Sequence, residues 1–207
     1  MTKKKFCISL LISLSILCFE GKAQLLSEEE LKVQPIYTSI EAALLSPERV
    51  YRLHLKGNLK QDSLPEAIFQ FVNLQELSLR RCRLQVINGN IGKLTYLQHL
   101  DLDNNRLVRL PSSICNLKEL QCLVISRNLI SSLPEEIGKM TKLERIDAWE
   151  NPLYVLPDQI SLLSETLRTI DLRQIGFRKE EIEHIETLLP KTTILYTNLC
   201  DCKNGRE

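Results

Sequence analysis

The side chains with the greatest chemical reactivity in the middle of the chain belong to His99, Asp101 and Cys122. A cysteine, a histidine and an aspartate can form a nucleophile with its activating base, and these residue types also bind zinc. Asp101 lies two residues after His99, and Cys122 follows His99 by 23 residues. A second pair, Cys200 and Cys202, stands near the C-terminus. Whether either set does chemistry depends on the elements that position it.

The interval of 23 residues is also the period of the chain. Leu74, Leu97, Leu120 and Leu143 follow one another at this interval. Within one period, residues 97–119, the sequence reads LQHLDLDNNRLVRLPSSICNLKE. Its leucines alternate at first, as in a strand, and an asparagine and a helix-like spacing follow. A fixed period of this size predicts a solenoid of stacked coils.

This pattern resembles the leucine-rich repeat family in its LxxLxLxxNxLxxLPxxIxxLxx form, which occurs in Ras-suppressor-like scaffolds and in many bacterial surface proteins. The resemblance implies an α/β solenoid, a right-handed coil with a concave parallel β-sheet, about six repeats and helical caps. Asn105, Asn128 and Asn151 occupy the turn after the strand, where an amide side chain can bond backbone groups of neighbouring coils. Cys82 stands at this position in one repeat, and we expect its thiol to be a weaker donor.

Both ends of such a stack need a cap, because an open end exposes apolar side chains and an unpaired strand edge. Near the N-terminus we expect a spacer and then a short helix over residues 38–46, where Thr38 and Glu41 match a capping box. Near the C-terminus we expect a helix over 179–189 and a last strand over 192–196. The predicted domains are a signal peptide (1–23), an N-terminal spacer and capping helix (24–49), leucine-rich repeats (50–190), and a C-terminal capping strand and tail (191–207).

Residues 1–23 have the pattern of a secretory signal. Three lysines precede the apolar run Phe6–Phe19, which is too short to span a bilayer comfortably, and cleavage after Ala23 fits the small residues there. One alternative is a lipoprotein signal at Cys18, which the preceding leucine disfavours. Another is an apolar anchor that is retained. No later stretch is long and apolar enough for a membrane span.

In this family's geometry, the residues between the strand leucines point out of the concave face. The resemblance therefore makes that face the first place to look for a partner. The candidate partner-binding residues on it are Lys56, Arg80, Arg81, Asp101, Asp103, Arg127, Arg145, Asp147, Trp149 and Arg173.

Trp149 is the only tryptophan, and four charged candidates are expected around it. These neighbours are Arg127, Arg145, Asp147 and Arg173. Aromatic residues and arginines dominate binding hot spots. Alternatively, Trp149 covers the side chains of the next strand, with an arginine stacked on it for structural reasons. Lys56, Arg80 and Arg81 form a basic corner, either for an acidic partner or as an ordinary solvated patch.

An open, flat sheet offers neither a water-excluded pocket nor donors for an oxyanion. We therefore expect no catalytic role for the histidine, aspartate and cysteine considered first, no cofactor, and no enzyme. The Cys200 and Cys202 pair lies in a loose tail, and its pairing stays open. Lysine plus arginine total 27 against 26 for aspartate plus glutamate, a balance that disfavours nucleic acid as a partner.

Taken together, the sequence predicts a secreted, periplasmic or cell-envelope protein, monomeric, that holds another protein on its concave face. The alternative is a structural or adhesive envelope component that binds glycan or host matrix.

Overall fold

The structure is a computed structural model that describes residues 25–57, 59 and 62–197 of the 207-residue chain. The expected signal peptide over residues 1–23, its cleavage site at Ala23, and the Cys200 and Cys202 pair lie outside the described residues. The division into domains at these boundaries stays a prediction.

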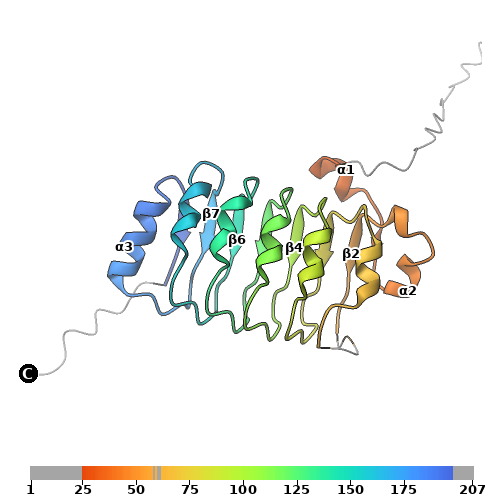
Figure 1. Cartoon of the computed structure of the whole chain (residues 1–207), viewed down its shortest axis with the longest axis horizontal. Coiled ribbons are helices and arrows are strands. Elements are labelled where there is room, and N and C mark those ends of the chain that lie inside the picture. Colours follow the sequence, from red (N-terminus) through yellow and green to blue (C-terminus); the bar gives the residue numbers. More distant parts are fainter. Residues whose placement is uncertain (1–24, 58, 60–61, 198–207) are drawn as a thin grey trace, which may run out of the picture.

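The repeats build a solenoid with one parallel sheet, as predicted (Figure 1). Eight strands pair in sequence order, each with the next. The strands are β1 (Ile36–Tyr37), β2 (Arg52–His54), β3 (Glu76–Ser78), β4 (His99–Asp101), β5 (Cys122–Val124), β6 (Arg145–Asp147), β7 (Thr169–Asp171) and β8 (Thr193–Leu195). Six of them, β2 to β7, belong to the six repeats.

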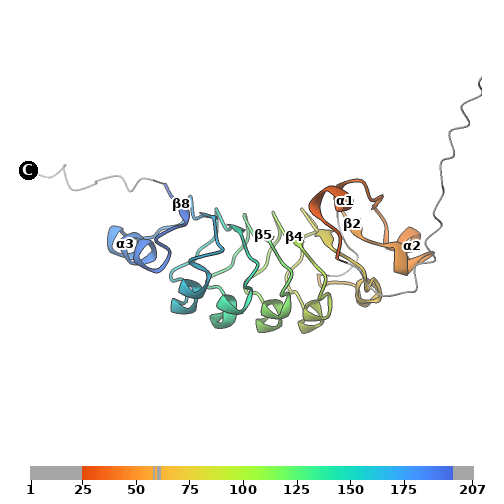
Figure 2. The same ribbon diagram turned by 90° about the horizontal axis from the view of Figure 1, so that it is seen from above.

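From β1 to β7, each connection between successive strands contains a short 3₁₀ helix, and α3 connects β7 to β8. The 3₁₀ helices are η1 (Pro47–Arg49), η2 (Glu66–Gln70), η3 (Gly89–Lys93), η4 (Ser112–Asn116), η5 (Glu135–Lys139) and η6 (Asp158–Leu163). In four repeats the proline of the Leu-Pro pair is the N-cap of this helix, where its fixed φ suits the bend and its missing amide proton costs nothing. Figure 2 shows these helices along the convex side, opposite the sheet.

The core is a continuous column of aliphatic side chains between the sheet and the 3₁₀ helices. The strand leucines and isoleucines are buried; Leu77, Leu123 and Ile146, for example, have no exposed surface. Each large aliphatic side chain buried in this way contributes about 1.5–3 kcal/mol. The coils are packed closely enough that a Cβ added at Gly138 would lie 2.4 Å from a backbone oxygen of the next coil.

A ladder of asparagine side chains stabilises the turns that follow the strands. The Asn128 side chain donates to the carbonyl of Leu102 in the preceding coil (3.0 Å) and to that of Ile125 in its own coil (2.9 Å), and it accepts from the Leu107 amide (3.0 Å). Asn105 and Asn151 repeat this arrangement. At the equivalent position, the Cys82 thiol donates to the Leu55 carbonyl at 3.4 Å, one cross-coil bond in place of several. Burial raises the pKa of this thiol to about 11, so it stays a donor.

The N-terminal cap differs from the prediction. The helix expected over residues 38–46 is shorter, α2 (Ile40–Ala43), and Ser39 rather than Thr38 is its N-cap and accepts from the Ala42 amide. The stretch expected to be a spacer contains helix α1 (Glu28–Lys32) and strand β1. Ser27 and Glu30 cap α1 reciprocally, which explains why so short a helix forms.

The C-terminal cap has the predicted elements. Helix α3 (Lys179–Leu188) buries Ile182 and Ile185 against the end of the stack, and β8 adds the last strand. Because Ile194 packs against the same core, the aliphatic column continues to the end of the sheet.

Candidate functional site

The strand register aligns the outward side chains of the concave face into columns. Direct pairing places Arg52, Glu76, His99, Cys122, Arg145 and Thr169 in one column. It places His54, Ser78, Asp101, Val124, Asp147 and Asp171 in the next. Strands about 4.8 Å apart bring successive members of a column into contact range.

The last column of candidates lies in the turn, where the backbone is left-handed. Arg81, Asn104, Arg127, Glu150 and Gln174 have φ values from 53° to 57°. Gly57 holds the same position in the first repeat, with φ 86°. A residue other than glycine costs roughly 1–2 kcal/mol in this conformation. From this turn the Arg127 side chain reaches Asp103 in the preceding coil, whereas Arg81 is exposed and bonds no described side chain.

Asp103 is the centre of an ion-pair network and does not face solvent as expected. Its side chain is only 2% exposed. The carboxylate accepts from Arg80 Nη2 at 3.0 Å and from Ser126 Oγ at 3.0 Å. It also binds Arg127 through both Nε (2.9 Å) and Nη2. Burial alone would raise the pKa of Asp103, but the hydrogen bonds from Arg127 and Ser126 outweigh burial and lower it. Asp103 therefore positions two arginines rather than meeting a partner itself.

Trp149 and Arg127 are brought together as the sequence predicted. The Arg127 guanidinium lies over the indole ring, 5.1 Å from its centroid, and Trp149 is half-buried. Such a cation–π contact contributes about 0.5–1 kcal/mol at an exposed site. Arg173 instead binds Asp171, with Nε and Nη2 at 2.9 and 2.6 Å.

Asp147 lies beside Asp171 on adjacent strands. Burial, and next the Asp171 carboxylate, raise the pKa of Asp147, while Arg145 at 3.5 Å opposes the rise. Half-buried Asp147, buried Asp171, the Trp149 ring and the exposed arginines give this surface both charged and apolar character.

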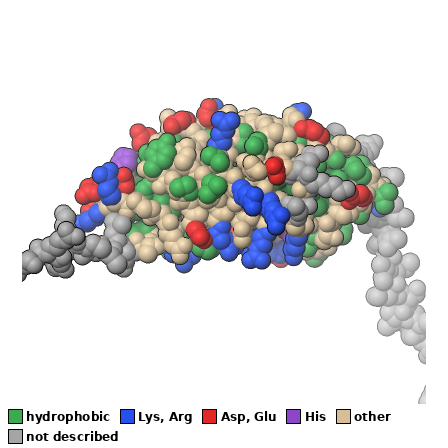
Figure 3. All heavy atoms as spheres, turned by 90° about the horizontal axis from the view of Figure 1, so that it is seen from below, with side chains coloured by type: hydrophobic (Ala, Val, Ile, Leu, Met, Phe, Trp, Pro, Cys, Tyr) green, Lys and Arg blue, Asp and Glu red, His purple; other side chains and the backbone are tan. Residues whose placement is uncertain are grey.

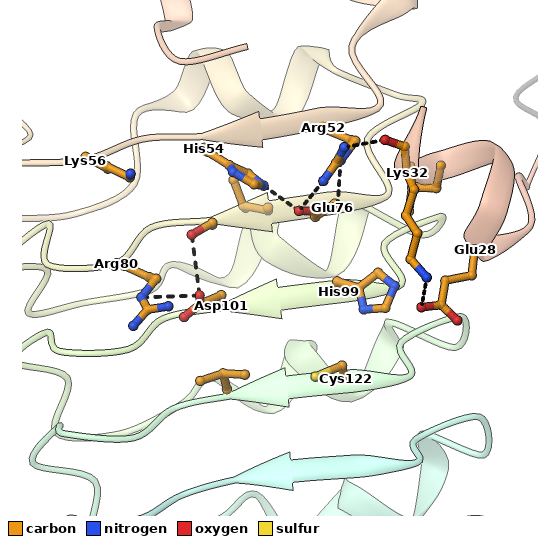
Figure 4. Close-up of a pocket in the computed structure, with 14 residues that line it drawn as sticks. Glu28, Lys32, Arg52, His54, Lys56, Glu76, Arg80, His99, Asp101 and Cys122 are labelled. Atoms are coloured by element: carbon orange, nitrogen blue, oxygen red, sulfur yellow. Dashed lines mark hydrogen bonds and ion pairs between the residues drawn. The ribbon is translucent and has the colours of Figure 1, made fainter. Parts of the chain in front are cut away.

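At the N-terminal end of the sheet the face is not flat, because α1 overhangs it. The overhang encloses a pocket of about 460 Å³ whose walls come from α1 and from β2 to β5 (Figure 4). Two long-range hydrogen bonds anchor the segment: the Leu26 amide donates to Gln75 Oε1 (2.9 Å), and Gln98 Nε2 donates to the Leu26 carbonyl (2.8 Å). Sequence reasoning missed this pocket. The available signals were the Ser27–Glu30 capping box and the recurrence of glutamine at 75, 98 and 121.

One wall of the pocket is an ion-pair cluster around Glu76. Arg52 binds this carboxylate through Nε at 2.7 Å, and His54 Nε2 contacts it as well. Burial favours the protonated acid, but the hydrogen bonds from His54 and Arg52 prevail and lower the pKa of Glu76 to about 2. Arg52 also donates to the Lys32 carbonyl (3.0 Å), which ties α1 to the sheet.

His99, Asp101 and Cys122 all line this pocket, but no hydrogen bond joins any two of them within the described part of the chain. Burial lowers the pKa of His99 and raises that of Cys122, so the pair favours neutral imidazole and neutral thiol. A thiolate–imidazolium pair would need the opposite shifts. Among residues 25–57, 59 and 62–197, no group of three or more His, Cys, Asp and Glu side chains has the geometry to hold a metal ion.

Several features now define the class of protein: a period of 23 residues, a parallel sheet with one strand per coil, and an asparagine ladder. The sequence profile of the leucine-rich repeat region matches residues 43–189, more than half of the chain. The chain belongs to the leucine-rich repeat family, whose members are typically non-catalytic binding modules.

Solved bacterial structures share this fold. A leucine-rich repeat protein of Leptospira interrogans is 33% identical, with a TM-score of 0.62 over 70% of this chain and 35% of the other. Internalin C2 of Listeria monocytogenes is 23% identical, with a TM-score of 0.61 over 72% and 62% of the two chains. Another internalin of that species is 20% identical, with a TM-score of 0.56 over 73% and 42%.

This chain thus spans about a third of the Leptospira protein and less than two thirds of either internalin. The two internalins establish likeness of fold. A search of curated protein sequences found no match. Within the part of the chain that the structure describes, no helix has the length and apolar character needed to cross a membrane.

Proposed function

We propose that this protein binds another protein on its concave face, centred on Trp149. The observation that carries the proposal is the position of the indole: it is half-buried on the open face of the sheet, beneath Arg127 and beside Asp147. Aromatic and arginine side chains in such settings supply most of the binding energy at protein interfaces. The concave surface of a solenoid offers them an extended, rigid platform.

The network behind Trp149 supports this role because it holds the platform in place. Asp103 is buried and binds Arg127 through two nitrogens, so the arginine is ordered before a partner arrives. Preorganised side chains lose little conformational entropy on binding. Arg145 and Arg173 have side chains more than half exposed, and each contacts an aspartate of its own strand.

We place the protein outside the cytoplasm, in the cell envelope or the exterior of a bacterium. The signal-like residues 1–23 support this, as does the relationship to bacterial leucine-rich repeat proteins. We further propose that the chain is not an enzyme, because the neutral states favoured for His99 and Cys122 do not suit nucleophilic catalysis.

The proposal is tested by affinity capture from envelope and culture-supernatant fractions, followed by mass spectrometry. The compared baits are the wild type, a Trp149→Ala, Arg173→Ala double variant, and a Tyr154→Ala control. Tyr154 is an aromatic side chain that is 65% exposed and lies outside the concave columns. We expect the control to retain the wild-type partner and the double variant to lose it. Recovery of the same partner by all three baits would refute the proposal. Binding to purified glycan without any protein partner would favour the adhesive alternative.

A further inference from the structure

A second surface lies on the edge of the solenoid, where the chain leaves each strand. Four arginines gather there in the second and third repeats: Arg81, Arg83, Arg106 and Arg109, here called the basic edge. Figure 3 views this edge and shows Lys and Arg side chains grouped on it. The Arg106 amide donates to the Leu84 carbonyl at 2.8 Å, so the two coils that carry these arginines are direct neighbours.

The arginines of the basic edge differ from those of the concave face in having no carboxylate partner. On the concave face, Arg52, Arg127 and Arg173 each bind a carboxylate. All four arginines of the basic edge are exposed, and none forms an ion pair or a side-chain hydrogen bond with another described residue. Asp62, an acid on this edge, accepts a hydrogen bond from Gln85 rather than from an arginine. Since the whole chain has a net charge of only +1, this concentration of positive charge is local.

The basic edge also contains a hollow of about 710 Å³ with apolar walls. Arg106 and Arg109 line it together with Val86 and Val108, which are 55% and 56% exposed. Isolated backbone bridges join Ser63 to Val86 and Ser132 to Val155 on this edge. Among the described residues, no such bridge joins the second repeat to the third, and the hollow lies at that interruption.

We propose that the basic edge binds an acidic segment of a partner protein that inserts an apolar side chain into the hollow. Arginine suits carboxylates because its planar guanidinium can donate two parallel hydrogen bonds. The valine walls distinguish a peptide from an anionic polysaccharide, which would leave them without apolar contact. Arg81 was expected on the concave face, but Arg106 and Arg109, which line the hollow, lie outside its columns, so neither proposal depends on the other.

Fluorescence anisotropy with labelled probes tests the proposal on the full chain. The first probe is a short peptide with two leucines flanked by glutamates; the second replaces the leucines with serines; the third is a heparin oligosaccharide. We expect the leucine peptide to bind at least about tenfold more tightly than either other probe, a difference of about 1.4 kcal/mol. Equal or tighter binding of the serine peptide or of heparin would overturn the proposal, because the edge would then be a general anion surface.

Charge-reversal variants test where on the protein the peptide binds. Arg106→Glu with Arg109→Glu should weaken the leucine peptide by at least about tenfold. The control, Lys93→Glu with Lys139→Glu, makes the same change in charge on the 3₁₀ helices η3 and η5 and should leave affinity within about twofold. Equal losses in both double variants would refute the site.

Two further variants test whether apolar contacts contribute to binding and whether the peptide binds the concave face instead. Val86→Ser with Val108→Ser should weaken the leucine peptide and leave the serine peptide unchanged. Trp149→Ala should leave binding of both peptides unchanged, since it lies outside the basic edge. Loss of peptide binding in Trp149→Ala would place the peptide on the concave face and overturn the proposal. Circular dichroism of every variant confirms that the exposed substitutions leave the fold intact.

Discussion

Replacing Asn128 with alanine tests the asparagine ladder quantitatively. The Asn128 side chain is buried; it donates to the carbonyls of Leu102, Ile125 and Ser126 and accepts from the Leu107 amide. The three carbonyls each accept a second hydrogen bond, from a neighbouring asparagine side chain or from the backbone. The Leu107 amide has no other acceptor within the described residues, and Leu107 is fully buried.

The expected loss follows from these partners. An orphaned buried amide costs about 1–3 kcal/mol, and each lost bond to a carbonyl that keeps a partner costs near the low end of 0.5–1.5 kcal/mol. We therefore expect Asn128→Ala to lower the free energy of unfolding by about 3 kcal/mol. Asn128→Cys should lower the free energy of unfolding by less than Asn128→Ala, because a thiol at this position can keep one hydrogen bond to the preceding coil, as Cys82 does to the Leu55 carbonyl.

Urea unfolding followed by circular dichroism measures these losses, provided that the slope of free energy against urea is the same in all variants. Asn116→Ala, an exposed asparagine in η4, is the matched control and should change stability by no more than about 0.5 kcal/mol. A loss below about 1 kcal/mol for Asn128→Ala would refute the reasoning, because the Leu107 amide would then have found another acceptor.

Three other predictions follow from packing, protonation and burial. Gly138→Ala should destabilise the chain by about 1–3 kcal/mol because its Cβ meets backbone, whereas Gly89→Ala should be nearly neutral; thermal unfolding compares them. Glu76 has a pKa of about 2 in the folded chain against an ordinary 4.5, so its contribution to stability is present above pH 4.5 and is lost as the pH falls towards 2. The free energy of unfolding of Glu76→Gln should therefore fall less steeply between pH 4.5 and 2 than that of the wild type. Burial raises the pKa values of Cys82 and Cys115 to about 11, so iodoacetamide should leave both unmodified in the folded chain, as peptide mass spectrometry can show.

The repeat could be predicted from sequence because one interval determines both fold and register. The leucines at fixed spacing place equivalent residues side by side, and the columns of the concave face follow without further information. The cation–π contact of Trp149 with Arg127 was predictable for the same reason. Periodicity is a strong signal here because every coil buries its side chains only with the help of its neighbours.

The overhang of α1 could not be predicted in this way. Its position depends on two hydrogen bonds of Leu26: its amide donates to Gln75 and its carbonyl accepts from Gln98, residues that are 49 and 72 positions away in sequence. No local pattern encodes such a contact. Asp103 was misjudged for a related reason: its column faces outward, but Ser126 and Arg127 fold over it from the next coil and bury it.

The asparagine ladder has a direction, so the order in which the coils are synthesised determines when their turn groups find partners. Each ladder side chain reaches back: Asn105 bonds Leu79 and Leu84, and Asn128 bonds Leu102. A coil that has just left the ribosome therefore keeps exposed amides and carbonyls until the coil after it is synthesised. Truncation is asymmetric for the same reason. Within the ladder, removing a coil from the C-terminal side strips backbone groups of its predecessor of their side-chain partners, whereas removing one from the N-terminal side leaves only the asparagine that reached for it without those partners.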